Sequence, residues 1–349
     1  MMRVKKSIHL CLAVFAILLS VRPFGLSALT EDEENTIAVV KRNVNAVVFI
    51  TNIQYSRDLF FGAHEVQRGT GTGFIWDSQG HIVTNYHVIE DGDAFMVTCP
   101  NRKNFKAKLI GREPGKDIAV LKVEQGQGDF TPVDTGSSGS LRVGQKVIAI
   151  GNPFGFDHTV TTGIVSALGR NIQGYGGITI RNMVQTDASI NPGNSGGPLL
   201  NSDGELIGMN TMIYSSTGTN AGIGFAVPAD TIKKIVPQLI KFGKVIRPGI
   251  GVSFLGDEYA RRYGIEGAVI IEVPRSSEAH RAGIRGIGRD RYGRLYVGDV
   301  LVGIDNIKIS SYDDLYNALD SYRIGDTVTL TLERNDKRRK IKFGLVKAD

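Results

Sequence analysis

The segment Gly193–Pro198 has the composition of a turn that exposes one reactive hydroxyl. It reads Gly-Asn-Ser-Gly-Gly-Pro, so that only small residues stand beside Ser195. A serine hydroxyl is a poor nucleophile until a base accepts its proton and hydrogen-bond donors stabilise the oxyanion that forms. The N–H groups of Gly193 and Ser195 could supply those donors. The segment indicates nucleophilic catalysis if the fold adds a base and an acid; otherwise it is a glycine-rich turn before an apolar strand.

Six histidines and 35 acidic residues are present, so spacing alone does not select the partners of Ser195. Three segments in chain order are similar to the His, Asp and Ser blocks of the HtrA/Deg serine proteases: Thr84–Val88, Asp117–Leu121 and Gly193–Pro198. That family has a chymotrypsin-like fold followed by PDZ modules. His81 and His158 match no block; we expect His81 to be solvated and His158 to pair locally.

The resemblance implies a role for each matching side chain. His87 would act as general base and then as acid, Asp117 would orient the imidazole, and Ser195 would form the acyl-enzyme. The oxyanion hole would comprise Gly193, Asn194 and Ser195. Considered singly, His87 could be a core histidine and Asp117 a turn residue at the start of a strand.

The same resemblance places the pocket for the residue before the scissile bond. Its lining would be Ile190, Thr211, Met212 and Ile213, which are apolar or small. Such a pocket favours aliphatic side chains with modest selectivity, because one methylene contributes only about 1–3 kcal/mol. The expected substrates are therefore unfolded proteins and peptides with exposed apolar segments.

The hydrophobic pattern divides the chain into two folded parts. From about Val44 to Phe225, short apolar runs alternate with turn signals, which is typical of an all-β barrel or sandwich. A helical period follows over Asp230–Phe242, where we expect Pro237 to split or kink the helix. We predict a mainly β protein: a two-barrel chymotrypsin-like protease domain at 29–243 and a smaller α+β PDZ domain at 244–349.

The second part is predicted to hold a peptide-binding groove. Its expected strands are Gly249–Phe254, Gly267–Val273, Asp299–Ile304, Thr327–Arg334 and Lys340–Val346, with a helix at Tyr312–Tyr322. The segment Gly249, Ile250, Gly251 and Val252 resembles the PDZ loop and strand that capture a peptide C-terminus.

Two basic segments in this part stand apart from the PDZ pattern. Arg285–Val297 interrupts it as an insert, which we expect to be a surface loop. The run Lys337–Lys340 is expected at a hairpin tip in water.

Residues 1–28 have the pattern of an export signal. A basic start precedes an apolar run at Ile8–Val21 and a small-residue site at Ser27-Ala28. This run is shorter than the roughly 20 residues of a membrane-spanning helix, although an uncleaved anchor stays open. The segment carries four of the basic residues behind the net charge of +6, so 6 − 4 leaves +2 for the remainder. That balance gives no indication of a nucleic-acid partner.

The predicted protein is an exported serine endopeptidase for misfolded proteins, periplasmic if the source is bacterial. Its PDZ module would recruit substrate or regulate activity, and the resemblance implies a homotrimer or higher homo-oligomer. Membrane contact is expected only if residues 1–28 are retained, and neither a cofactor nor a metal is expected. Two alternatives remain: an anchored signalling protease with one dedicated substrate, and a chaperone or binding protein with an idle triad.

Overall fold

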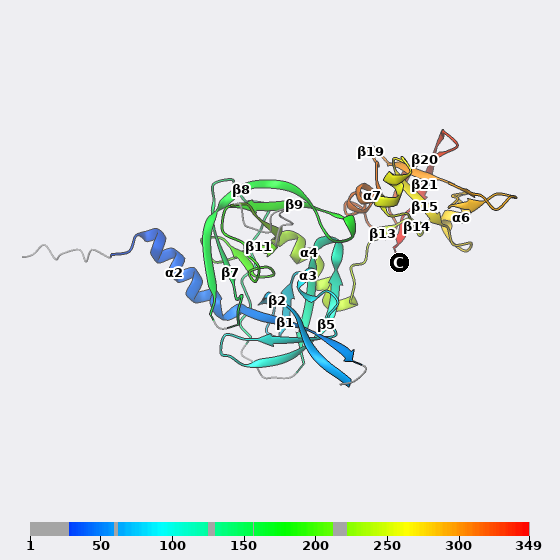
Figure 1. Ribbon diagram of the computed structural model, residues 1–349. Helices are drawn as coiled ribbons and strands as arrows, with labels where there is room; N and C mark the ends of the chain where they lie inside the picture. Colours follow the sequence, from blue (N-terminus) through cyan, green and yellow to red (C-terminus); the bar gives the residue numbers. More distant parts are fainter. Residues whose placement is uncertain (1–27, 59–61, 125–129, 156, 212–221, 349) are drawn as a thin grey trace, which may run out of the picture. The chain divides into compact units, whose positions relative to one another are not determined.

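Figure 1 shows the computed structural model, which describes residues 28–58, 62–124, 130–155, 157–211 and 222–348. Among the sequence predictions, the export signal before Ala28 and the pocket residues Met212 and Ile213 lie outside these ranges. Helix α2 spans Glu31–Asn43, and residues 39–349 form one compact unit. Within the described residues, no helix combines the length and apolar character needed to cross a bilayer.

The first barrel is coloured blue to cyan in Figure 1 and closes in the strand order β1-β2-β3-β6-β5-β4. Its strands are β1 Val47–Asp58, β2 Gly62–Ile75, β3 His81–Thr84, β4 Ala94–Thr98, β5 Asn104–Glu113 and β6 Ile118–Val123. Side chains of β4 alternate between buried and half-buried, as expected for a strand with one face on the core. Strand β3 is buried along its whole length because the second barrel covers its outer face.

The second barrel, green in Figure 1, closes in the order β10-β11-β12-β9-β8-β7. Its strands are β7 Lys146–Gly151, β8 Thr159–Gln173, β9 Thr179–Thr186, β10 Pro198–Leu200, β11 Leu206–Thr211 and β12 Gly224–Pro228. Helix α4 follows at Ala229–Phe242 and is continuous through Pro237, so the predicted split does not occur. Burial of the apolar face that includes Ile232 and Leu239 offsets the hydrogen bond that proline cannot make.

The C-terminal domain is an antiparallel sheet with short helices. The sheet has the order β14-β15-β18-β20-β21, with β19 on β18 and a separate β13-β22 pair. These strands are β13 Pro248–Gly249, β14 Ser253–Phe254, β15 Ala268–Glu272, β18 Val300–Ile304, β19 Ile307–Lys308, β20 Thr327–Arg334, β21 Lys337–Gly344 and β22 Val346–Lys347. The helices are α5 Asp257–Arg262, α6 Glu278–Arg281 and α7 Tyr312–Leu319.

Two predicted elements of this domain have the wrong bounds. The strand expected at Gly249–Phe254 is divided into β13 and β14, because Gly251 has a φ of +70°, which breaks the extended backbone. Helix α7 ends at Leu319, three residues before the predicted end, and a turn follows in which Tyr322 N–H donates to the Leu319 carbonyl.

The two basic segments of the domain are ordered parts of its framework. The insert contains a hairpin, β16 Gly288–Arg289 with β17 Leu295–Tyr296. The run Lys337–Lys340 is mostly exposed and forms the start of strand β21, directly after the hairpin turn, because it pairs with β20; its Arg339 also lies 3.3 Å from the buried Asp299. Asp299 also accepts from the Arg285 N–H at 2.7 Å and so fixes the base of the insert.

Candidate active site

The barrel register brings His87 and Asp117 together across 30 residues of sequence. His87 lies in helix α3, Tyr86–Ile89, directly after β3, and Asp117 directly precedes β6. Strands β3 and β6 pair with Thr84 opposite Ala119, so both side chains lie at the same end of the pair. The imidazole Nδ1 is 2.9 Å from Asp117 Oδ2 and 3.1 Å from Oδ1.

Asp117 is held by three further groups. Its backbone has a φ of +54°, a left-handed conformation that is uncommon outside glycine. Asn85 Nδ2 donates to its carbonyl at 3.0 Å, and the His87 N–H donates to Oδ1 at 3.0 Å. The Thr211 hydroxyl donates to Oδ2 at 2.7 Å. These contacts fix the carboxylate, which is only 7% exposed, in one orientation toward the imidazole.

The imidazole of His87 is partly accessible, with 32% of its side chain exposed. Burial acts most strongly on this group and disfavours the charged ring, but the hydrogen bond and charge of Asp117 and the charge of Glu90 act the other way. Together the carboxylates prevail and raise the pKa of His87 above its ordinary value. The ring is therefore a stronger base than a free imidazole and holds a proton more readily once it has accepted one.

Ser195 lies in the tight turn that its glycines predict. Gly196 has a φ of +85°, and a Cβ there would lie 2.0 Å from the Thr72 carbonyl, so no other residue fits. Ser195 is 4% exposed, and its Oγ has no hydrogen-bond partner among the described residues. Ser195 and His87 line one cavity, but the Ser195 Oγ makes no hydrogen bond to the imidazole in this structure.

Some backbone N–H groups of this turn donate a hydrogen bond within the protein, and others have no acceptor there. Asn194 donates to Asn191 O at 3.0 Å, and Gly196 donates to Asn210 O at 2.8 Å. Among the described residues, no acceptor is found for the N–H groups of Gly193 and Ser195. Two of the three predicted oxyanion donors are thus available, whereas the N–H of Asn194 closes the turn.

Thr72 is a site residue that sequence reasoning missed. Its hydroxyl donates to Gly193 O at 2.5 Å and accepts from the Asn152 N–H at 2.8 Å. Its N–H also donates to the Ser195 carbonyl at 2.9 Å. The only sequence signal is its position inside the glycine-rich stretch Gly69–Gly73.

The remaining predicted residues have mixed outcomes. Ile190 is buried in the core of the second barrel, while Thr211, predicted to line the pocket, directs its hydroxyl to Asp117. His81 is buried, against expectation, with Nδ1 2.7 Å from Asp77 Oδ2. His158 Nε2 contacts the Val47 carbonyl, 111 residues away, instead of a local group. No group of potential metal ligands occurs among the described residues.

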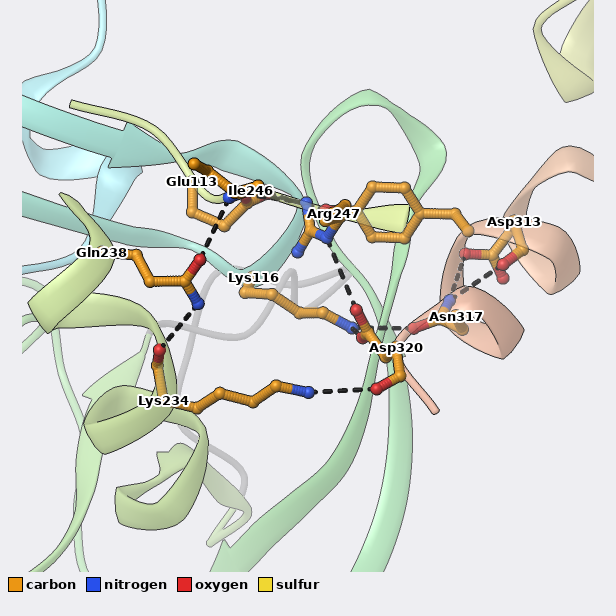
Figure 2. A network of polar contacts seen from close by, with 10 residues as sticks. Glu113, Lys116, Lys234, Gln238, Ile246, Arg247, Asp313, Asn317 and Asp320 are labelled. Carbon is orange, nitrogen blue, oxygen red and sulfur yellow. Dashed lines mark hydrogen bonds and ion pairs between the residues drawn. The ribbon is translucent and has the colours of Figure 1, made fainter. Parts of the chain in front are cut away.

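The loop before Asp117 is joined to helix α7 by a network of polar contacts, shown in Figure 2. We call it the α7 clasp; it consists of Glu113, Lys116, Arg247, Tyr316, Asn317 and Asp320. Lys116 Nζ lies 2.8 Å from Asn317 Oδ1 and 3.0 Å from Asp320 Oδ2. Arg247 bonds Glu113 at 2.8 Å, and the Tyr316 hydroxyl donates to the same carboxylate at 2.6 Å. Two cations and two carboxylates thus balance each other in a largely buried setting.

Helix α7 also borders a groove of about 410 Å³. The four predicted groove residues, Gly249 to Val252, line one side, and Leu315, Tyr316 and Leu319 of α7 line the other. Arg247 and Glu113 of the α7 clasp lie at its edge. The groove and the loop before Asp117 therefore share one helix.

Comparisons with known proteins agree with this geometry. The model of the trypsin-like peptidase domain matches residues 71–209, and the model of the PDZ domain matches residues 248–345. Protease Do-like 1, chloroplastic, of Arabidopsis thaliana is 46% identical over 319 residues, which are 91% of this chain and 73% of that protein. A probable periplasmic serine protease do/HhoA-like of Haemophilus influenzae is 39% identical over 80% of this chain and 58% of its own length.

Solved structures give the same result. The HtrA-type protease AlgW with a decapeptide has a TM-score of 0.67 and 30% identity, covering 90% of this chain and 99% of that one. The serine endoprotease from Yersinia pestis has a TM-score of 0.62 and 33% identity, with 90% and 98% covered. The chain therefore belongs to the HtrA/Deg family of serine proteases, with a trypsin-like peptidase domain followed by a PDZ domain.

Proposed function

We propose that this serine endopeptidase degrades unfolded or misfolded proteins with His87, Asp117 and Ser195 as its triad. One observation supports it above all: an unpartnered serine hydroxyl beside two N–H groups without acceptors, in a cavity shared with a carboxylate-bound imidazole. These are groups that acyl transfer to serine uses, and the hydrogen bond from Ser195 to His87 that completes the set is not formed in this structure.

Each step uses a group whose position is given above. His87 accepts the Ser195 proton as the hydroxyl attacks the peptide carbonyl, and the N–H groups of Gly193 and Ser195 bind the oxyanion. Asp117 stabilises the imidazolium, which then gives its proton to the leaving amine. Water enters after that amine departs, His87 accepts its proton, and the ester to Ser195 is hydrolysed.

Active-site labelling and digestion test the proposal directly. A fluorophosphonate probe is expected to label the wild type and to leave Ser195→Ala unlabelled. The wild type should also degrade casein and a denatured globular protein, while Ser195→Ala degrades neither. Labelling without degradation of any unfolded protein would favour the signalling protease with one dedicated substrate, and a lack of labelling would favour a chaperone or binding protein.

For the PDZ domain, we propose peptide capture in the groove beside α7, coupled to the protease through the α7 clasp. The apolar α7 residues that line the groove and the shared Tyr316 support this role. The neighbour solved with a decapeptide is a related protease with a bound peptide. An apolar peptide with a free C-terminal carboxylate should change the rate of hydrolysis of a second substrate, whereas its C-terminal amide should have little effect.

Export and assembly complete the proposal. The signal pattern of residues 1–28 and the periplasmic and chloroplastic names of the relatives support an exported protein. N-terminal sequencing of the mature protein tests cleavage against a retained anchor. We also propose a homotrimer or higher homo-oligomer, which light scattering on the purified protein tests.

A further inference from the structure

A cavity of about 230 Å³ adjoins the proposed catalytic groups. His87, Gly193 and Ser195 form its inner end. Its outer wall comes from the first barrel: Arg68, Gly69 and Thr70 of β2, and Glu90 and Asp91 after α3. This wall contains charged side chains, in contrast to the apolar or small residues predicted for the pocket of the residue before the scissile bond.

The lining residues show which half of a substrate the cavity receives. None of them belongs to β11 or β12, and Ile190 and Thr211, predicted for the pocket that precedes the scissile bond, do not line it. The imidazole must deliver its proton to the leaving amine, so the amine departs on the His87 side of Ser195. A cavity that touches both residues and extends away from β11 receives the residue directly after the scissile bond.

The charges of this cavity do not cancel. Arg68 lies 3.0 Å from Asp91 Oδ2 and 2.9 Å from Gln54 Oε1, so its guanidinium already has acceptors. The carboxylate of Glu90 has no cationic partner among the described residues, and its charge reaches the site, since it helps raise the pKa of His87. It also accepts a hydrogen bond from the Tyr175 hydroxyl, and this bond together with the charge of Glu90 raises the pKa of Tyr175 to about 12. One cation against two carboxylates leaves the wall with a net negative charge.

We propose that this cavity is the subsite for the residue after the scissile bond and that it selects lysine or arginine there. The proposal rests on Ser195 as the nucleophile. An entering basic side chain approaches the carboxylates of Glu90 and Asp91. Arg68, whose side chain is 46% exposed, can turn toward solvent as the substrate cation replaces it beside Asp91.

Acyl transfer to added amines measures this subsite directly. An acyl-enzyme formed from an ester with an aliphatic acyl residue reacts either with water or with an amino-acid amide, which occupies the position after the scissile bond. Arginine amide and citrulline amide are the matched pair, because they differ in charge and hardly in shape. Arginine amide should capture the acyl group about three- to fivefold better at low salt, the range of a partly exposed ion pair, and this preference should fall as salt rises.

Variants of the charged wall test whether Glu90 and Asp91 cause the preference for arginine amide. Glu90→Gln and Asp91→Asn should each lower the arginine-to-citrulline ratio toward one. Arg68→Gln should raise it, because Asp91 then lacks its internal partner. Glu272→Gln, an exposed carboxylate on β15, is the matched control and should leave the ratio unchanged. Comparing two amines in the same reaction cancels any effect of these variants on His87.

Two results overturn the subsite alone: equal capture of arginine and citrulline amides, or better capture of glutamate amide than of glutamine amide. The second would mean that Arg68 selects an acidic residue. Failure to form any acyl-enzyme, seen as no probe labelling and no burst with the ester, would overturn the proposed function together with the subsite.

Discussion

At the scale of single residues, each barrel holds the reactive group of the other through a threonine hydroxyl. Thr72 of the first barrel binds the Gly193 carbonyl in the nucleophile turn. Thr211 of the second barrel binds the carboxylate of Asp117, which belongs to the first. The two bonds cross the barrel interface in opposite directions. The site is therefore complete only when the two barrels are docked in this arrangement.

Replacing Thr72 tests the first of these bonds. Thr72→Val keeps the shape of the side chain but removes the donor to the Gly193 carbonyl, so the turn that carries the Gly193 and Ser195 N–H groups loses an anchor. We expect kcat to fall about tenfold with a small change in KM, less than the roughly 10²–10³ for loss of a donor itself. Steady-state hydrolysis of an ester measures this. Thr72→Ser, which keeps the hydroxyl, should restore most of kcat; equal losses in both variants would contradict the assignment.

The pH profile tests the charge environment of His87. The imidazole must be neutral to act as base, so kcat/KM rises with pH through the pKa of His87. Because Asp117 and Glu90 raise that pKa, the acid limb should lie above the ordinary value of about 6.5. Glu90→Gln removes one of the raising charges and should move the limb to lower pH. An uncharged ester measures the limb, with Glu272→Gln as control; an unmoved limb in Glu90→Gln would refute the link.

Sequence reasoning proposed roles for single residues and missed the residues that hold them in place. Ser195, His87 and Asp117 lie in short segments that can be recognised locally. The partners of Thr72 and Thr211 are 121 and 94 residues away, so the barrel register alone determines them. His81 was misjudged for a related reason, because the covering second barrel that buries β3 leaves no mark on the sequence of β3.

At the scale of elements, the start of α4 shows how one carboxylate fixes a helix against a barrel. Asp230 Oδ2 accepts from the Ser137 and Ser138 hydroxyls at 3.0 Å and from the Gly139 N–H at 2.8 Å. Burial opposes the charge most strongly, but these bonds and Lys233 together lower the pKa of Asp230 to about 2. The contacts tie the first turn of α4 to a loop more than 90 residues earlier.

The Asp230 contacts give a stability prediction with a defined sign. A carboxyl with a lowered folded pKa stabilises the protein above its unfolded pKa of about 3.9, and that contribution is lost as pH falls toward about 2. Asp230→Asn should cost about 1 kcal/mol at pH 7, since the side chain is 43% exposed and solvent screens the charge. Urea unfolding in a Ser195→Ala background measures the difference, which should shrink at pH 3.5. A difference independent of pH would contradict the charge argument.

The bounds of a helix or strand could be predicted from the sequence where a local pattern of apolar residues and turn signals determines them. Strand β20 has the predicted bounds, Thr327–Arg334, because it is an alternating run between turn signals. The pattern predicted a helix over Asp230–Phe242 with a split or kink at Pro237, and the packing that keeps α4 unbroken there comes from both barrels. Strands such as β8, with an exposed and irregular pattern, gave no clear periodic signal.

At the scale of the whole molecule, helix α7 connects two separate sites. One face lines the PDZ groove through Leu315 and Leu319, and its C-terminal end meets the loop before Asp117 through Asn317 and Asp320. Its first turn also contacts the second barrel, where Asp313 accepts from the Thr179 N–H at 2.6 Å. A ligand that displaces α7 would therefore also disturb the segment next to Asp117, and this is the physical basis for the proposed coupling between the sites.

Lys116 is the residue through which this coupling can be broken selectively. Lys116→Met retains the length of the buried side chain but removes the charge that joins Asp320 and Asn317 to the residue next to Asp117. In the wild type, we expect a groove peptide to change kcat/KM by at least about fivefold; in Lys116→Met, that factor should approach one while the affinity of the peptide stays the same. Fluorescence anisotropy measures affinity, and ester hydrolysis with and without peptide measures coupling.

Lys234 provides the matched control for this last experiment. The Lys234 Nζ donates to the backbone carbonyl of Asp320 at 3.0 Å. Unlike Lys116, Lys234 is exposed and belongs to helix α4, not to the loop before Asp117. Lys234→Met therefore removes a charge from the same neighbour without touching the catalytic loop, and it should keep the wild-type factor. If both variants lose the coupling equally, the connection passes through Asp320 and α4. If neither loses it, the α7 clasp has a purely structural role.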